Sequence, residues 1–282
     1  MMIGSLLNNA ETWINVTKDD LNQLTNPDKM LLRDTLSSYG NPSKCFMYLE
    51  LGIIPVRYVL MSKRMKYLRT ILGESMDTML RNVYETLKTD SRNGDFVDLV
   101  QKDFMELNMN FTDKEIEDYS EYQWNFFVNY HIKKKAFSDL VEENQTEEKT
   151  KEIIFKKLEM SDYLKTNVNT AITRIIFSIR ARTLDIKSWN IWNYDNNMCD
   201  MCEVSVEDID HFVSCASYES EPLKTDWKHI MENDTEKQIM IAEIVQKRIT
   251  EREKRQEEAG LDSIPGPNAP IIVEQCNSNV MI

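Results

Sequence analysis

Four residues in the last third of this 282-residue chain have the types and spacing of a metal site. Cys199, Cys202, His211 and Cys215 follow the pattern C-x2-C-x8-H-x3-C. Three thiolates and one imidazole are ligands that Zn²⁺ prefers, and two cysteines separated by two residues can form a tight knuckle around one ion. His211 and Cys215 are four residues apart, so they fit one face of a helical turn. The pattern predicts a bound zinc ion.

The composition of the chain favours a structural zinc ion over other uses of these residues. The chain has only five cysteines and three histidines, and four of these eight residues fall within 17 positions. All four ligands would be protein groups, which leaves no open position for a catalytic water. The low, odd cysteine count and the lack of a signal peptide argue against a disulfide framework. The alternative is a set of buried free thiols beside a surface histidine.

The elements that must position this cluster are predicted to be α-helices. Seven glycines and seven prolines are few for a chain of this length, which favours long helices over hairpins. Apolar residues recur with a helical period over 56–72, 75–88, 96–107, 169–184 and 235–258. No apolar run approaches the roughly 20 residues that span a bilayer, so we expect no membrane partner.

We expect four regions along a mainly α-helical chain. These are a helical bundle over 1–110, a helical extension over 111–195, the zinc knuckle over 196–218, and a charged helix with a flexible acidic tail over 219–282. Pro265, Gly266 and Pro267 interrupt regular structure in the tail, which is typical of a partly disordered segment.

The net charge of −13 by itself argues against a nucleic-acid partner. The acidity is concentrated at one end, because residues 199–282 carry 18 acidic and 8 basic residues whereas residues 1–198 carry 29 and 26. Two stretches are locally basic and are candidates for contact with phosphates. The candidate residues are Arg57, Lys63, Arg64, Lys66 and Arg69 in the first stretch and Arg180 and Arg182 in the second.

Residues 116–136 are rich in aromatic side chains and end in three lysines, Lys133 to Lys135. Aromatic rings beside lysines can stack on the bases of a single-stranded nucleic acid. The alternative, which the sequence alone favours, is an ordinary packed helix with a solvated lysine end.

Several blocks of the sequence together resemble a known family. NAETW at 9–13, YLELGIIPVR at 48–57, KRMKYL at 63–68 and FSIRAR at 177–182 occur in this order before the Cys/His cluster. The arrangement resembles the C-terminal third of non-LTR (LINE-like) retrotransposon polyproteins, over roughly residues 5–218. In that family a reverse transcriptase palm is followed by an α-helical thumb and then by a CCHC zinc knuckle.

The resemblance implies contacts with nucleic acid. Residues 1–110 would form the thumb, in which the basic residues of 57–69 grip the template–primer backbone without reading its sequence. Arg180 and Arg182 would do the same just before the knuckle, which would help to hold RNA or DNA while its zinc organises the fold. The resemblance begins near Met1, which implies a truncated element copy, a gene-model fragment or a host-adopted gene.

The chain departs from the family in its chemistry. The palm uses an aromatic-x-Asp-Asp turn to hold two catalytic metal ions, and this motif is missing from the sequence. The Asp19-Asp20 pair follows Thr17 and fits a capping box at a helix start. The gap of three residues between His211 and Cys215 is shorter than the four often found in the family.

The remaining titratable residues do not suggest an enzyme. His131, His229, Cys45 and Cys276 stand apart in the sequence from any group that would activate them. We therefore expect no catalytic activity and no small-molecule substrate, in a protein related to reverse transcriptases.

Two kinds of partner stay open. One is RNA or DNA, bound weakly through the basic stretches. The other is a protein, bound through the helix over 235–258 or through the acidic zinc segment, in a chain without nucleic-acid binding. The acidic residues of that segment are Asp200, Glu203, Glu207, Asp208 and Asp210. In either case we expect an intracellular protein, with the choice between nucleus and cytoplasm left open.

Overall fold

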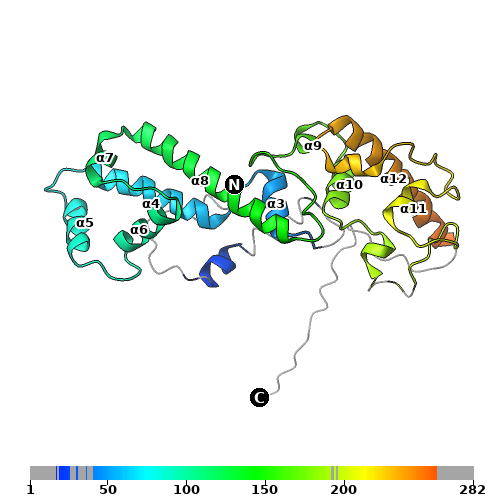
Figure 1. Cartoon of the computed structure of the whole chain (residues 1–282), viewed down its shortest axis with the longest axis horizontal. Coiled ribbons are helices and arrows are strands. Elements are labelled where there is room, and N and C mark those ends of the chain that lie inside the picture. The colour runs from blue at the N-terminus through cyan, green and yellow to red at the C-terminus, as the bar shows by residue number, and fades with distance from the viewer. Residues whose placement is uncertain are drawn as a thin grey trace, which may run out of the picture. The chain divides into compact units, whose positions relative to one another are not determined.

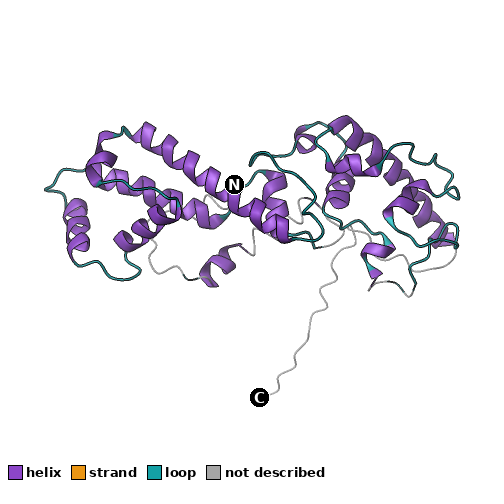
Figure 2. Cartoon of the chain, in the orientation of Figure 1, coloured by secondary structure: helices purple, strands orange, loops and turns teal. Residues whose placement is uncertain are grey.

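The computed structural model describes residues 17, 19–25, 30, 36, 41–191, 194 and 196–258. Within these ranges the regular elements are helices (Figure 2). Pairing between extended segments is limited, in the same ranges, to two isolated β-bridges. The prediction of a mainly α-helical protein is confirmed. The labelled elements are α3 (Lys44–Leu51), α4 (Val56–Gly73), α5 (Met79–Thr89), α6 (Phe96–Glu106), α7 (Asp113–Asp118), α8 (Glu121–Thr146), α9 (Asp162–Lys165), α10 (Thr170–Arg180), η2 (Lys187–Trp189), α11 (Ile209–Ser214), η4 (Trp227–Met231) and α12 (Thr235–Glu258).

The chain folds into two compact units. The first comprises Met1–Thr35 with Pro42–Asn167, and the second comprises Leu36–Asn41 with Val168–Ile282. The boundaries predicted at 110, 195 and 218 do not separate these units, because α8 packs against α3 and α4 and the Cys/His segment packs within the second unit. The predicted tail beyond residue 258 lies outside the described residues.

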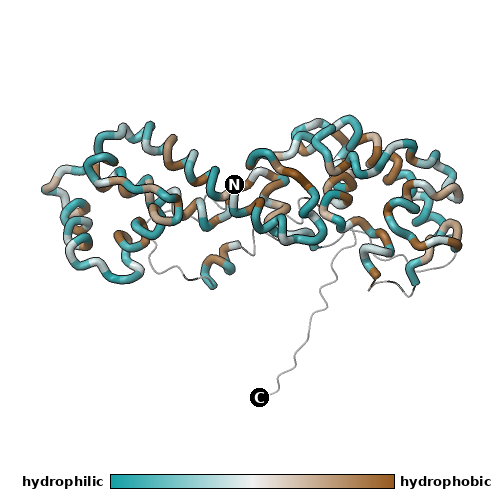
Figure 3. The backbone as a smooth tube through the Cα atoms, in the orientation of Figure 1, coloured by the Kyte–Doolittle hydropathy of each residue, from teal (hydrophilic) through white to brown (hydrophobic). Residues whose placement is uncertain are grey.

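Helix α4 is the central element of the first unit. It packs lengthwise against α8, and α5, α6 and α7 also contact it (Figure 1). Trp124 of α8 is fully buried there, and its Nε1 donates a hydrogen bond to the carbonyl oxygen of Met65 at 2.8 Å. Hydrophobic and hydrophilic positions are interspersed along α8 (Figure 3), and the buried apolar ones recur every four residues. Its buried apolar residues are Trp124, Val128, Ile132, Ala136 and Leu140.

Helix α3 ends at Gly52, a position that only glycine fits. Its φ of +64° lies in the left-handed region, and a Cβ atom on it would lie 2.3 Å from the backbone nitrogen of Met160. This close approach lets Leu51 form an isolated bridge with Met160, and the amide of Ser161 donates to the carbonyl oxygen of Glu50 at 2.9 Å. Backbone hydrogen bonding therefore holds the segment around Met160, which follows α8 in the sequence, against the end of α3.

No single helix in the described ranges has the length and apolar composition needed to cross a membrane. The bent pair of α3 and α4, whose axes differ by 59°, meets that criterion only when the two helices are taken together.

Side-chain caps fix the starts of several helical segments, and two of them illustrate the capping box. The carboxylate of Asp20 accepts from the amide of Thr17 at 2.8 Å, and the hydroxyl of Thr17 accepts from the amide of Asp20 at 3.1 Å. The prediction that the Asp-Asp pair belongs to a capping box is therefore confirmed. Ser120 and Gln123 form a second such box at the start of α8.

Arg64 on α4 forms a buried ion pair with α6. Its Nε and Nη2 atoms donate to the two carboxylate oxygens of Asp103, each at 2.8 Å, and both side chains are almost fully buried. Burial raises the pKa of the Asp103 carboxyl, and the hydrogen bonds from Arg64 oppose that rise. The guanidinium of Arg64 therefore stabilises the charged form of the buried Asp103 side chain of α6.

The second unit is built on α10 and α12. These helices pack along each other, and η4 and α11 pack on α12. The helix predicted over 235–258 is confirmed, with Ile241 and Val245 fully buried. The helix predicted over 169–184 ends earlier, at Arg180, because Arg182 adopts a left-handed φ of +50° that turns the chain.

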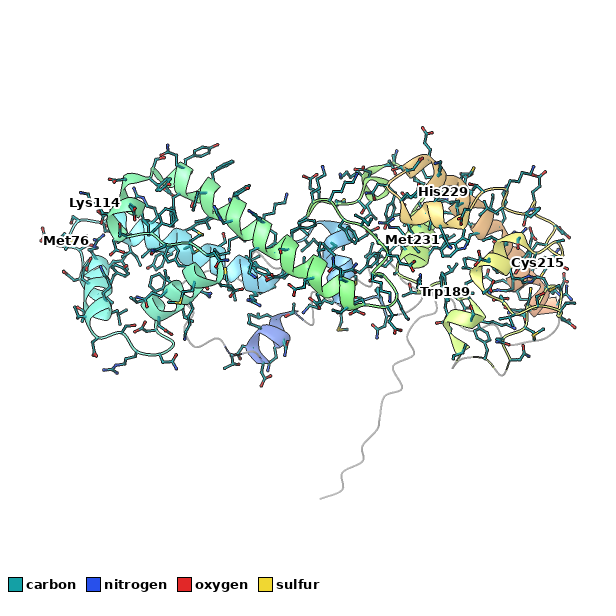
Figure 4. The ribbon with its side chains drawn as sticks, viewed as in Figure 1. Met76, Lys114, Trp189, Cys215, His229 and Met231 are labelled. Atoms are coloured by element: carbon teal, nitrogen blue, oxygen red, sulfur yellow. The ribbon has the colours of Figure 1, made fainter. Side chains whose placement is uncertain are left out.

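We expect Arg64→Ala to destabilise the first unit by about 3–5 kcal/mol, because it leaves the Asp103 carboxylate buried without its partner. Lys114→Ala, on the exposed surface of α7 in the same unit (Figure 4), should leave the unfolding midpoint unchanged. Urea denaturation followed by circular dichroism measures both effects. Equal midpoints for the two variants would contradict a structural role for Arg64.

Candidate metal centre

The first two residues of the Cys/His cluster lie on a tight turn. Met198 and Val206 form an isolated antiparallel bridge, and inside it the amide of Cys199 donates to the carbonyl oxygen of Ser205 at 2.8 Å. The amide of Glu203 donates back to the carbonyl oxygen of Cys199 at 2.8 Å, and Glu203 has a left-handed φ of +59°. Cys199 and Cys202 therefore lie on one hydrogen-bonded turn, which is compatible with the C-x2-C spacing.

Helix α11 carries the other two residues of the cluster. Its N-cap is Asp208, whose carboxylate accepts from the amide of His211 at 2.7 Å. Cys215 ends the helix, and its amide donates to the carbonyl oxygen of His211 at 2.7 Å. Figure 4 shows Cys215 beyond the last turn of α11. The four-residue spacing therefore places both side chains on one helical turn, as the sequence predicts.

The structure brings the four predicted ligands together. The sulfur atoms of Cys199, Cys202 and Cys215 and a ring nitrogen of His211 all lie within 4.8 Å of one another. Cys202 Sγ lies 3.3 Å from His211 Nε2. Tetrahedral coordination with bonds of about 2.0–2.3 Å requires ligand atoms roughly 3.5–3.8 Å apart. The cluster therefore fits a single metal ion with little movement of its side chains.

The four candidate ligands differ in their surroundings. Cys199 and Cys215 are buried, whereas Cys202 and His211 are partly exposed. Burial raises the pKa of the Cys199 thiol to about 12, whereas hydrogen bonding from the amide of Val204 lowers the pKa of the Cys202 thiol to about 6. Because a metal binds the thiolate, it must displace the proton from Cys199, so metal affinity is expected to fall as pH falls.

Arg248 of α12 supports the C-terminal half of the cluster. Its Nη1 donates to the carbonyl oxygens of Phe212 at 2.7 Å and Cys215 at 3.1 Å, and its Nη2 donates to that of Ser220 at 3.3 Å. The guanidinium also lies 4.7 Å from the ring centroid of Tyr218. Because Arg248 is fully buried, it supplies hydrogen-bond donors to the buried carbonyl oxygens of Phe212 and Cys215.

Arg252, one turn further along α12, links the cluster to the chain that precedes it. Its Nη1 donates to Glu207 Oε1 at 2.8 Å and to the carbonyl oxygen of Asp185 at 2.9 Å. Glu207 is fully buried, and burial raises its pKa while the charge of Arg252 lowers it. The pair fixes Glu207, which lies in sequence between the two halves of the cluster, against α12.

Two further cations support the knuckle. Lys187 is buried, and its Nζ donates to the carbonyl oxygen of Met198 at 2.7 Å and to the carboxylate of Asp200 at 2.5 Å. Arg255 Nη1 donates to the carbonyl oxygen of Met201 at 2.9 Å. Basic side chains from η2 and α12 therefore hold the backbone on both sides of Cys199.

The acidic residues that the sequence predicts as a docking surface have partners inside the second unit. The partners are Lys187 and Gln256 for Asp200, Arg255 for Glu203, Arg252 for Glu207, the amide of His211 for Asp208 and the indole nitrogen of Trp227 for Asp210. Asp200, Glu203 and Glu207 are therefore ion-paired within the chain, whereas Asp208 and Asp210 accept hydrogen bonds from neutral groups and keep their charge.

Two of the arginines predicted to contact nucleic acid are buried. Arg64 is paired with Asp103, and Arg180 is fully buried with its Nη1 donating to the carbonyl oxygen of Ile230 at 2.9 Å. Their predicted role in phosphate contact is corrected to a structural one, because a buried guanidinium does not reach a phosphate at the surface. Arg182 is partly exposed at the turn after α10.

Two other arginines of the predicted set reach the surface, but each already has a polar partner within the first unit. Arg57 is ion-paired with Glu106 of α6. Arg69 Nε donates to the carbonyl oxygen of Tyr119 at 2.8 Å, in the connection between α7 and α8. Both side chains therefore stabilise the packing around α4, and only part of each remains open to solvent.

Lys63 and Lys66 are the predicted cations that lie partly exposed on α4 beside α8. Lys66 Nζ donates to Oδ1 of Asn129 on α8 at 2.7 Å. Burial, and then the nearby charge of Lys63, lower the pKa of Lys66. The two like charges are therefore held close to each other at the surface.

The roles of Arg248 and Arg252 in the metal centre were not among the sequence predictions. Ile241, Val245, Arg248 and Arg252 are separated by four, three and four residues, which places them on one face of α12, and all four are buried. The sequence signal that could have predicted these roles is the presence of two arginines at core positions of an apolar helix face. A buried cation requires hydrogen-bond acceptors nearby.

Comparisons of the chain with models of protein families, with curated proteins and with solved structures find no match. The function is therefore inferred from the geometry of the chain itself.

We expect the protein to bind one metal ion that a chelator removes. Cys215→Ser should abolish binding and lower the thermal stability of the second unit, because a serine hydroxyl does not replace a thiolate ligand. Cys45→Ser, at a buried cysteine of the first unit, should keep the metal. Native mass spectrometry counts the ions, and a full complement in the Cys215→Ser protein would contradict the assignment.

Arg252→Ala should destabilise the second unit by about 3–5 kcal/mol, since Glu207 would stay buried without its partner. Arg252→Met combined with Glu207→Leu replaces the pair by apolar side chains and should recover much of the loss. Chemical denaturation followed by tryptophan fluorescence measures these changes, with the exposed Lys254→Ala as a neutral control. A double variant as unstable as Arg252→Ala would rule out the pair as the cause.

Proposed function

We propose that this chain is a non-catalytic protein derived from the thumb and zinc-knuckle region of a non-LTR retrotransposon reverse transcriptase. Its second unit holds a structural zinc ion, and its first unit binds RNA or DNA weakly and without reading the sequence. The order of the resembling sequence blocks, the helical fold and the Cys/His cluster support this origin.

The donor set supports zinc as the metal. Three cysteines and one histidine are a common ligand set of structural zinc sites, and thiolates disfavour the hard ions Mg²⁺ and Ca²⁺. All four positions of a tetrahedron would be filled by protein groups, so the ion would hold Cys199 and Cys202 to α11 and would not activate water.

The observation that carries the nucleic-acid proposal is the pair of lysines at the surface of α4. Lys66 is hydrogen-bonded to the neutral amide of Asn129, so that contact does not neutralise its charge, and Lys63 adds a like charge nearby. A phosphate beside them would be attracted by both positive charges. Contacts of this kind, made to the backbone without base contacts, bind nucleic acids irrespective of sequence.

The proposed function does not include polymerisation. A polymerase needs carboxylates that hold two metal ions at the primer end, and the sequence lacks the family motif that supplies them. Asp20, in the Asp-Asp pair nearest to that pattern, is used to cap a helix with Thr17.

The alternative is a zinc-stapled module that binds a protein instead of nucleic acid. Its two predicted surfaces are weakened as docking sites by their internal contacts. Asp200 and Glu207 are ion-paired within the second unit, and α12 buries one face against α10, η4 and α11.

We expect Lys63→Glu combined with Lys66→Glu to lower the affinity for labelled RNA and DNA at least about tenfold, by replacing attraction to phosphate with repulsion. The plot of log affinity against log salt concentration has a negative slope, and the magnitude of that slope should decrease by about two because two phosphate contacts are lost. Fluorescence anisotropy over a salt series measures both, and circular dichroism checks folding. Arg64 is left unchanged in this variant because its substitution is expected to destabilise the first unit.

The matched control is Lys224→Glu combined with Lys254→Glu, which makes the same change in total charge at exposed lysines of the second unit. The control should bind within about threefold of the unmodified protein. If the control lost as much affinity as the α4 variant, binding would depend on net charge and not on this surface. An unmodified protein that binds no nucleic acid would refute the proposal.

A further inference from the structure

Helix α8 carries three aromatic side chains that its packing does not use. Tyr122, Phe126 and Tyr130 are 80%, 67% and 57% exposed. They are four residues apart, so they form a single row along the helix, called here the aromatic stripe. The sequence favours a packed role for the aromatic residues of this segment, and for these three side chains the structure corrects that expectation.

The opposite side of α8 supplies the packing against the first unit. Trp124, Val128 and Ile132 are fully or almost fully buried, and each lies two residues from a member of the aromatic stripe. A displacement of two residues is about 200° around a helix, so the two rows point in opposite directions. The fold therefore has its apolar face in the buried row, and it does not require large apolar rings in the exposed one.

The charges beside the aromatic stripe are positive. Residues 122–138 contain no aspartate or glutamate, and Lys133 and Lys134 are exposed in the turn that follows Tyr130. Lys66 of α4 reaches the same face, because its partner Asn129 lies one turn before Lys133 and two turns after Tyr122. Flat rings and cations thus share one surface.

Glu121 precedes Tyr122 at the start of α8, whereas the two acidic groups nearest to the lysines, Asp139 and Glu159, have basic partners. Asp139, which ends the acid-free stretch, accepts from Lys135 at 2.7 Å. Glu159 is close enough to Lys133 to respond to its charge, but its carboxylate is bound by Lys157 at 2.7 Å. Glu159 therefore offsets the charge of Lys133 only in part, and both Lys133 and Lys134 are exposed to an anion from solvent.

The spacing of the rings matches a strand whose bases are not stacked on each other. Four residues of helix rise about 6 Å, which is the separation of successive side chains along the stripe. The bases of a duplex are about 3.4 Å apart along each strand and are covered by their neighbours. An extended single strand can place successive bases on successive rings and its phosphates near the lysines.

We infer that the aromatic stripe with Lys66, Lys133 and Lys134 is a binding surface for single-stranded nucleic acid, through base stacking on the three rings. This rests on the proposed function, and it names the form of nucleic acid that the first unit prefers. A ligand that carries both flat apolar faces and negative charges satisfies both kinds of side chain on this surface. An apolar protein segment would cover the rings and would leave the lysines without counter-charges.

The test compares three labelled probes by fluorescence anisotropy at low salt. They are an oligothymidylate of about 15 nucleotides, an abasic strand of the same length, and a duplex of the same length. The unmodified protein should bind the oligothymidylate at least about tenfold more tightly than the other two, because only that probe offers accessible bases. Equal affinity for all three would overturn the inference and leave phosphate binding intact.

Variants of the stripe separate stacking from charge. Tyr122→Ala with Phe126→Ala and Tyr130→Ala should reduce oligothymidylate affinity at least about tenfold while leaving duplex affinity unchanged. Tyr122→Phe with Tyr130→Phe keeps the rings and should bind within about twofold of the unmodified protein. Met79→Ala with Val83→Ala removes exposed apolar side chains from α5 and should also have no effect.

The outcomes distinguish the two proposals. If the triple alanine variant binds the oligothymidylate as tightly as the unmodified protein, stacking is refuted while binding through Lys63 and Lys66 stands. If the unmodified protein binds none of the probes, both proposals fail. Since all three side chains are exposed, circular dichroism should show an unchanged fold in each variant.

Discussion

The Cys/His cluster depends on buried guanidinium groups that donate hydrogen bonds to an irregular stretch of backbone. A knuckle and a short helix leave carbonyl groups without partners in regular structure, and buried carbonyl groups need donors. Arg248 and Arg252 supply those donors from a regular helix, where a rigid fork of N–H groups can reach several acceptors at once. The Cys/His segment is therefore organised from two directions, by a metal ion that its side chains can hold and by α12, which holds its main chain.

Basic residues in this chain serve opposite purposes according to their position on a helix. Arg64 and Lys63 are neighbours in sequence, but about 100° of helix rotation separates a core ion pair from a surface charge. On α12, likewise, Arg252 is buried in an ion pair whereas Lys254, two residues later, is exposed. A count of basic residues in a segment therefore overstates the charge available to a partner. Of the basic residues of α4, Lys63 and Lys66 keep part of their charge at the surface.

The sequence predicts the features that depend on local spacing. The ligand set follows from the C-x2-C and H-x3-C intervals, and the α-helical class follows from apolar period and scarce glycine and proline. The two compact units could not be predicted, because they depend on which helices pack together. The periodicity of the sequence also could not predict which row of side chains on α8 is buried. Trp124, Val128 and Ile132 have the same four-residue spacing as Tyr122, Phe126 and Tyr130, and only the contact with Met65 and its neighbours decides between them.

The position of α12 in the chain has a consequence for synthesis on the ribosome. Arg248 is translated 33 residues after Cys215, and Arg252 is 53 residues after Cys199. At about 5–20 residues per second, the thiols leave the ribosome several seconds before the helix that buries two of them. During that interval the nascent segment is open to oxidants and to competing ions. Early capture of a metal would protect the thiols, so the order of translation favours a metal that binds first and a helix that then encloses it.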